Sequence, residues 1–200
     1  MDLNTICGIC SFLIGCMGFS FAVMTNRENK RLKRERFRFS WHDVYQGTKE
    51  LSKTAVKKFK PDIMIVTPGG PSIVANLLLE HQQYFVRQVC LSIGSPFIKD
   101  HNLDNNQLVE TVNYHVWLPN SLCEETQKDT RKILIVDDAL FTGELVLAIR
   151  DSLIKTGYLE SNIEICSLIA MSTVMRSTIA PKWVHFEVTS SDFFLPWGKV

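Results

Sequence analysis

The strongest constraint on the fold is the segment of residues 133–145, whose sequence is Ile-Leu-Ile-Val-Asp-Asp-Ala-Leu-Phe-Thr-Gly-Glu-Leu. Four consecutive aliphatic residues predict a strand that is buried on both faces, and two aspartates end it. A short turn follows, and Gly143 opens a predicted helix that runs to about Thr156, with Gly157 as its C-terminal cap. A buried strand that leads directly into a helix is typical of a parallel sheet covered by helices on both faces.

The chain after residue 39 repeats this alternation of helix and strand. Ser40 and Asp43 form a capping box that begins a helix, and Pro61 ends it. The further predicted elements, in order, are a strand at 62–66, a turn at 67–71, a helix at 72–82, a strand at 84–93, a polar loop at 95–108, a strand at 110–118, a charged loop at 119–131, a strand at 163–171 and an extended aromatic tail at 183–200. We therefore predict an α/β fold with a mostly parallel twisted sheet flanked by helices.

Two of these turns are candidates for a ligand site. Parallel sheets bind ligands at the carboxyl ends of their strands, where the turn at 67–71 and the turn after Asp138 both lie. The free N–H groups of the following helix, beside Thr142 and Gly143, suit a phosphate. Asp137 and Asp138 can accept hydrogen bonds from the two hydroxyls of a sugar or hold a divalent cation. Together these groups describe a ribose 5-phosphate site. The alternative is structural, with the acids merely capping the helix.

The same segment resembles the phosphoribosyl pyrophosphate signature of the type I phosphoribosyltransferases, a pattern of four aliphatic residues, two acids, a short turn and Thr-Gly. Phe39–Asp62 is similar to the first helix of the xanthine–guanine branch of that family. Ile63–Glu80 is similar to the strand, Gly-Gly turn and helix that carry the pyrophosphate loop, and Phe193–Trp197 resembles a Pro-Trp segment of the base-binding hood. The matches occur in the family's order and span residues 39–198.

The resemblance implies a fold with a small C-terminal hood, an activity and a set of binding residues. The family binds phosphoribosyl pyrophosphate or a nucleoside monophosphate with Mg²⁺, exchanges pyrophosphate and a base at C1 of the sugar, and commonly forms homodimers. Asp137 and Asp138 would be the catalytic pair that meets the ribose hydroxyls, with Mg²⁺ nearby. The other implied binding residues are Phe141, Thr142, Gly143 and Glu144 for the 5-phosphate, Thr67, Gly69 and Gly70 for the pyrophosphate, and Phe193 for the base.

Four positions depart from the family pattern. Pro68 stands where the family usually has Arg or Lys before Gly-Gly, so this position offers a pyrophosphate no charge. Phe141 replaces an acid that faces the base in the purine branch, and Phe cannot exchange a proton. Leu145 replaces a small hydroxyl residue, and Asp192 stands where an aromatic residue stacks on the base. The ribose-phosphate half of the site is kept, and the pyrophosphate and base halves are altered.

Three functions are compatible with this altered site. The first is a phosphoribosyltransferase with an unusual acceptor or nucleotide substrate. The second is a catalytically inactive module that senses a nucleotide, and the third is an interaction protein whose site is vestigial. Arg87, Lys99 or His101 could supply the missing cation, and each could equally be a plain surface residue. The net charge of +1 does not point to nucleic acid as a partner.

The N-terminal region is apolar and then basic. The stretch from Ile6 to Met24 is 19 residues long and, as a helix, matches the ~30 Å hydrocarbon thickness of a bilayer. Seven basic residues follow it. We predict a transmembrane anchor at 1–26, a basic stalk at 27–38 and a phosphoribosyltransferase-like domain at 39–200, which makes a single-pass membrane protein with residues 27–200 in the cytoplasm. The alternatives are a buried N-terminal helix for the first segment and, for the stalk, a topology signal with or without binding to anionic lipid.

Overall fold

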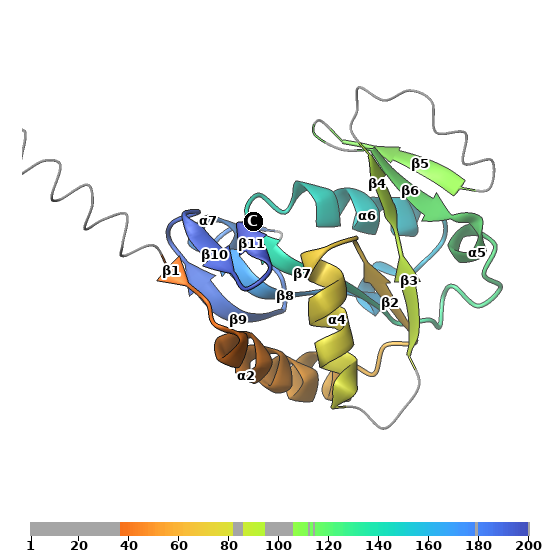
Figure 1. Cartoon of the computed structure of the whole chain (residues 1–200). Coiled ribbons are helices and arrows are strands. Elements are labelled where there is room, and N and C mark those ends of the chain that lie inside the picture. The colour runs from red at the N-terminus through yellow and green to blue at the C-terminus, as the bar shows by residue number, and fades with distance from the viewer. Residues whose placement is uncertain are drawn as a thin grey trace, which may run out of the picture.

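The computed structural model describes residues 37–81, 86–94, 106–111, 113, 115–178 and 180–199. Its centre is a parallel sheet of five strands in the order β3-β2-β7-β8-β9 (Figure 1). These strands are β2 (Ile63–Val66), β3 (Arg87–Cys90), β7 (Ile133–Leu140), β8 (Ile163–Met171) and β9 (Trp183–Val188). The prediction of an α/β fold with a mostly parallel sheet is therefore confirmed.

Helices cover both faces of this sheet. The main ones are α2 (Trp41–Leu51), α4 (Gly70–Glu80) and α6 (Glu144–Lys155). On β2, Met64 and Val66 belong to the core layer that contains α2 and α4, whereas Ile63 and Ile65 belong to the layer that contains α6. All four side chains are buried. Because a strand between two helical layers has no solvent-facing side, it is a continuous aliphatic run.

The first helix begins as predicted. The backbone N–H of Asp43 donates to the Ser40 hydroxyl at 3.2 Å, and the Asp43 carboxylate accepts from the Ser40 N–H at 2.7 Å. This capping box starts α2, which continues through a π-helical segment, η1 (Ser52–Val56), into α3 (Lys57–Phe59). The helix ends where Lys60 adopts a left-handed φ of 54°. The predicted helix therefore has the expected limits, with one wider turn inside.

An antiparallel sheet stands beside α6 and is not what the sequence analysis predicted. It consists of β4 (Ser92–Gly94), β6 (His115–Pro119) and β5 (Asn106–Glu110), and α5 (Asn120–Cys123) follows it. The prediction of one strand at 110–118 is wrong, because the chain reverses there and Glu110 of β5 pairs with His115 of β6. The strand predicted at 84–93 is divided at Leu91 between the two sheets. Of the predicted loop at 95–108, residues 95–105 lie outside the described residues.

A third small sheet brings the two ends of the domain together. It pairs β1 (Phe37–Arg38) in parallel with β10 (Phe193–Leu195), which pairs antiparallel with β11 (Gly198–Lys199). The chain reaches it from β8 through the short helix α7 (Ser172–Met175) and β9. The turn between β10 and β11 approaches the end of β7 (Figure 1), and a base-binding hood in this tail stays a prediction.

β7 is longer than the four-residue strand predicted from its aliphatic run. It continues through the two aspartates, and its last residue, Leu140, still pairs with Ala170 of β8. The turn to α6 is therefore only three residues long, and Gly157 closes α6 with a φ of 109°. The acids thus belong to a paired strand and not to a loop.

The structure contradicts the prediction of a single-pass membrane protein. Across the residues that the structure describes, no helix is both long and apolar enough to span a bilayer. The two core layers on either side of the sheet consist of apolar side chains of these residues, whereas Trp41, Tyr45, Leu108 and Leu159 are exposed. The apolar stretch at 6–24 lies outside the described residues, and the limits at 1–26 and 27–38 and the binding of anionic lipid stay predictions.

Candidate functional site

A cavity of about 840 Å³ lies where β2 and β7 end and where α4 and α6 begin. Most of the predicted site residues line it, namely Thr67, Gly70, Asp137, Asp138, Phe141, Thr142, Gly143 and Glu144. Gly69 and Phe193 are predicted site residues that lie outside the lining. The cavity is at the carboxyl ends of the parallel strands, where a ligand site was expected.

The two aspartates lie side by side near the end of β7, but their surroundings differ. The backbone N–H of Asp138 donates to Oδ1 of Asp137 at 2.9 Å. Asp138 is only 6% exposed, and its Oδ2 accepts a hydrogen bond from the indole Nε1 of Trp197 at 2.9 Å. Gly70 closes on the same oxygen, since a Cβ at this position would lie 1.8 Å from Oδ2 and 2.4 Å from the indole nitrogen. The first turn of α4 can approach the acid pair only because residue 70 is glycine.

The acid pair holds protons more firmly than ordinary carboxyl groups do. Burial, together with the negative charge of Asp138, raises the pKa of Asp137 to about 8. Burial also raises the pKa of Asp138, whereas the hydrogen bond from Trp197 lowers it. Since two adjacent carboxylates resist ionising together, the pair releases its protons at a higher pH than two isolated aspartates would. A cation held by these carboxylates would compete with protons for the same oxygens.

The start of α6 offers groups that suit an anion. Gly143 is the N-terminal cap and adopts a left-handed φ of 74°. The first N–H groups of a helix have no partner within the helix, and the helix dipole makes this end positive. The Thr142 hydroxyl is exposed beside them and accepts from the Glu144 N–H at 3.4 Å. A phosphate can therefore be held here by backbone groups and one hydroxyl, without a charged side chain.

The turn before α4 contributes backbone but no charge. Thr67 is buried, and its carbonyl accepts a hydrogen bond from the Ser72 hydroxyl at 3.1 Å. Gly69 has a φ of 91°, which residues with a Cβ rarely adopt, although the space around it is open. Pro68 lines the cavity and offers neither an N–H nor a charge. This turn can cradle a ligand but cannot neutralise it.

Aromatic rings form another part of the cavity wall. Phe141 lines the cavity and stacks on Phe193, with the ring centroids 5.5 Å apart and an interplanar angle of 7°. Phe193 is 2% exposed and belongs to the core behind it. Trp197 also lines the cavity and packs on Trp41 with the ring centroids 5.8 Å apart. A flat base in this cavity would meet Phe141 and Trp197 before it met Phe193.

The cavity lining is acidic. Within the described part of the chain it contains Asp137, Asp138 and Glu144 and no Lys, Arg or His. Lys99 and His101, two candidates for the missing cation, lie outside the described residues. A polyanionic ligand in this cavity would therefore need a cation that accompanies it.

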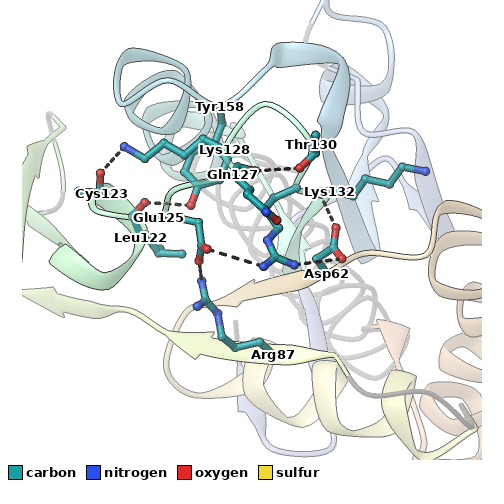
Figure 2. A network of polar contacts seen from close by, with 11 residues as sticks. Asp62, Arg87, Leu122, Cys123, Glu125, Gln127, Lys128, Thr130, Lys132 and Tyr158 are labelled. Atoms are coloured by element: carbon teal, nitrogen blue, oxygen red, sulfur yellow. Dashed lines mark hydrogen bonds and ion pairs between the residues drawn. The ribbon is translucent and has the colours of Figure 1, made fainter.

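Arg87, the third candidate for the missing cation, lies at the opposite end of the parallel strands. Figure 2 shows its guanidinium directed toward Glu125, with Nη2 3.0 Å from Oε2. Arg131 lies between Glu125 and Asp62, at 3.8 and 3.7 Å from their carboxylate oxygens. These ion pairs join the segment before β7 to the starts of β2 and β3. Arg87 therefore serves this network and does not reach the cavity.

The acid pair fits Mg²⁺ in combination with a ligand. Mg²⁺ prefers oxygen donors and is commonly held by one or two carboxylates together with phosphates and water. Asp137 and Asp138 supply such carboxylates. Among the residues with described positions, no cluster of three or more His, Cys, Asp or Glu could hold a metal alone. Because Oδ2 of Asp138 is bound by Trp197, a cation would use the other oxygen.

Several residues of the lining were not among the predicted site residues, namely Ile93, Asn113, Ser191 and Trp197. Asn113 reaches the cavity from the connection between β5 and β6, and its side-chain amide donates to the Glu144 carboxylate at 2.8 Å. No local pattern marks Asn113 or Ser191. The turn sequence Pro-Trp-Gly at 196–198 was a signal for Trp197, although the prediction chose Phe193 instead.

The two remaining departures from the family pattern lie in different settings. Leu145 lines the cavity in the first turn of α6, so an apolar side chain stands where a hydroxyl was expected. Asp192 is exposed in the tail, where its N–H donates to the Ser190 hydroxyl at 3.2 Å. Neither residue supplies the ring or the hydroxyl that the family pattern has there.

Comparison with known proteins finds similarity in structure only. No family model and no curated protein matches the sequence. A purine phosphoribosyltransferase from Pyrococcus horikoshii Ot3 has a TM-score of 0.57 and 17% identity, covering 82% of this chain and 94% of its own. A hypoxanthine-guanine phosphoribosyltransferase from Bacillus anthracis has a TM-score of 0.58 and 15% identity, covering 80% and 86%. A hypothetical protein from Neisseria gonorrhoeae with bound ppGpp has a TM-score of 0.56 and 15% identity, covering 81% and 89%. The chain therefore has the fold of the type I phosphoribosyltransferases.

Proposed function

We propose that this protein binds phosphoribosyl pyrophosphate or a nucleoside monophosphate together with Mg²⁺, and that it transfers the phosphoribosyl group between pyrophosphate and a base. The observation that carries the proposal is the common wall formed by the acid pair and the start of α6. In this wall, two carboxylates and the N-terminus of a helix, an end that suits a phosphate, line one cavity. The shared fold supports the same function.

Each part of the ligand has a partner in this proposal. The N–H groups of α6 and the Thr142 hydroxyl hold the 5-phosphate, and the acid pair accepts hydrogen bonds from the ribose hydroxyls. The backbone of the turn at 67–71 lies beside the pyrophosphate. Mg²⁺, bound with the ligand, would offset the charges of the phosphates and carboxylates. The protein thus acts mainly by positioning and electrostatics.

The chemical step needs no nucleophile from the protein. A base nitrogen forms a bond to C1, the bond from C1 to the pyrophosphate oxygen breaks, and pyrophosphate leaves with the bonding electrons. Phe141 lines this part of the cavity and cannot take the proton of the attacking nitrogen. That proton passes to solvent or to the departing pyrophosphate. The base is therefore expected to be one that gives up its proton readily.

Nucleotide sensing without catalysis is the second candidate function. It is favoured by Pro68 and Phe141, which leave the pyrophosphate and base sides of the lining without charge or acid. The structurally similar Neisseria gonorrhoeae protein was solved with ppGpp bound. In this alternative the cavity binds a nucleotide and releases no pyrophosphate. A homodimer stays a prediction for both functions.

Calorimetric titration of the full-length chain tests the proposal. The probes are phosphoribosyl pyrophosphate with Mg²⁺ and a panel of nucleoside monophosphates that includes GMP. We expect binding that the double variant Asp137→Ala/Asp138→Ala loses. Asp151→Asn is the matched control, because Asp151 is an exposed acid on α6 outside the lining.

A pyrophosphate-release assay with a panel of bases then separates the two functions. Turnover that Asp138→Asn abolishes supports the transferase. Binding without turnover supports the sensor, and no binding of any probe would overturn both.

A further inference from the structure

The hydrogen bond between Trp197 and Asp138 joins the tail to the acid pair. We propose that Trp197 is a positioning residue, which together with Gly70 holds Oδ2 of Asp138 so that this carboxylate meets a ligand through Oδ1 alone. This inference rests on the proposed binding of a phosphoribosyl compound. It assigns a role in that binding to a side chain 59 residues away from its partner in the sequence.

Two contacts occupy the same oxygen. The indole Nε1 of Trp197 donates to Oδ2 at 2.9 Å, which is a full hydrogen bond to a carboxyl oxygen. Gly70 approaches so closely that a Cβ there would lie 1.8 Å from Oδ2. An oxygen enclosed by an indole and by the start of α4 has no room for a ligand hydroxyl. Asp138 nevertheless lines the cavity, so the other carboxylate oxygen is the one that can face a ligand.

The indole of Trp197 is itself in contact with another aromatic ring. Its ring packs on Trp41 at the start of α2, with the ring centroids 5.8 Å apart. Trp197 lies in the turn between β10 and β11, and β10 is paired with β1. The donor therefore stands in a short turn between two paired strands and contacts a second aromatic ring. Such support is what a positioning residue needs, because it limits the rotamers of both partners.

The first measurement asks whether the contact exists, and it needs no ligand. The chain has four tryptophans, so a ¹H–¹⁵N spectrum of the full-length protein contains four indole N–H signals. The signal that Trp197→Phe removes belongs to Trp197. We expect Asp138→Asn to move this signal upfield, since an amide oxygen is a weaker acceptor than a carboxylate. Asp151→Asn should leave it in place.

The second measurement asks whether the contact matters for binding. We expect Trp197→Phe to weaken the binding of GMP with Mg²⁺ about tenfold. This is the effect of losing one hydrogen bond between the ligand and the carboxylate of Asp138, which Trp197 no longer positions. Trp183→Phe is the matched control, because Trp183 packs on Phe59 away from the cavity lining. Replacing Trp197 by β-(3-benzothienyl)alanine keeps the ring size and removes only the N–H. It should reproduce the loss even if the smaller Phe disturbs folding.

The outcomes separate this inference from the proposed function. If the wild type binds GMP and both Trp197 variants bind it equally well or more tightly, the inference is overturned and the proposed function stands. Tighter binding would mean that the indole competes with the ligand for Asp138. If the indole N–H signal of Trp197 does not move in Asp138→Asn, the inference is also overturned. No binding of GMP or phosphoribosyl pyrophosphate by the wild type would overturn the proposed function and the inference together.

Discussion

At the scale of single residues, two adjacent glycines are required for different reasons. Residue 69 needs a φ of 91° and has open space, whereas residue 70 has a Cβ position that overlaps Asp138 and Trp197. We expect Gly70→Ala to displace these two side chains and to move the indole N–H signal of Trp197. Gly69→Ala should cost about 1–3 kcal/mol of unfolding free energy through backbone strain and leave that signal in place. Denaturant unfolding and indole spectra measure the two effects, and an equal movement of the signal in both variants would contradict the distinction.

The half-buried Asp137 of β7 makes stability depend on pH. The pKa of Asp137 is raised from 3.8 to about 8 in the folded protein. Between about pH 4 and pH 8, the folded state therefore keeps a proton on this carboxyl that the unfolded chain has released. Stability contributed by this group is therefore present below about pH 4 and is lost as the pH rises toward 8. Asp137→Asn cannot ionise, so we expect it to raise the melting temperature at pH 8 and to raise it less at pH 5. Equal changes at both pH values would argue against a carboxyl whose pKa is raised in the folded protein.

At the scale of elements, β10 and the turn after β7 place two stacked rings in different surroundings. Phe193 of β10 is buried in the core, whereas Phe141 lines the cavity. We expect Phe193→Ala to lower the unfolding free energy by about 3–5 kcal/mol, the usual cost of truncating a buried Phe. Phe141→Ala should cost less in stability and should weaken nucleotide binding, because it removes a wall of the cavity. Urea unfolding and calorimetry compare the pair, and a selective loss of binding in Phe193→Ala would support the earlier prediction that Phe193 meets the base.

The elements that were predictable from sequence are those whose cause is local. The capping box at Ser40, the aliphatic run of β7 and the cap at Gly157 each act within a few residues, and each element has its predicted place. The hairpin of β5 and β6 was missed because a chain reversal between two strands left no turn signal of Gly or Pro. Among cavity residues, Asp137, Asp138 and Phe141–Glu144 were predicted because they form one continuous motif, although Ala139 and Leu140 between them were not. Trp197 and Asn113 reach the cavity through tertiary packing, which no local spacing reveals.

At the scale of the whole molecule, the charge of the cavity has the same sign as the charge of the proposed ligand. The described cavity lining carries three acids and no basic side chain, while a phosphoribosyl compound is itself an anion. The backbone groups of α6 can hold one phosphate, but nothing in the described lining offsets a second cluster of negative charge. We expect EDTA to abolish the binding of phosphoribosyl pyrophosphate, which carries two such clusters, and to weaken GMP binding less. Titrations with and without EDTA measure this difference, and an equal loss for both ligands would place the requirement for metal at the ribose instead.

The same imbalance predicts that one added cation will change which ligand the cavity prefers. Pro68 is exposed on the cavity wall in the turn proposed to lie beside the pyrophosphate. Pro68→Lys would bring an ammonium group to that side, and a hydrogen bond between charged groups is worth about 1.5–3 kcal/mol, or roughly tenfold or more in affinity. We expect the affinity for phosphoribosyl pyrophosphate to rise by that factor while the affinity for GMP, which has no pyrophosphate, stays nearly unchanged. Ser161→Lys, at an exposed position in the 3₁₀ turn before β8, adds the same charge outside the cavity lining and should alter neither affinity. A gain of equal size for both ligands would mean that the turn at 67–71 does not face a pyrophosphate, and that the ligand lies in the cavity in another orientation.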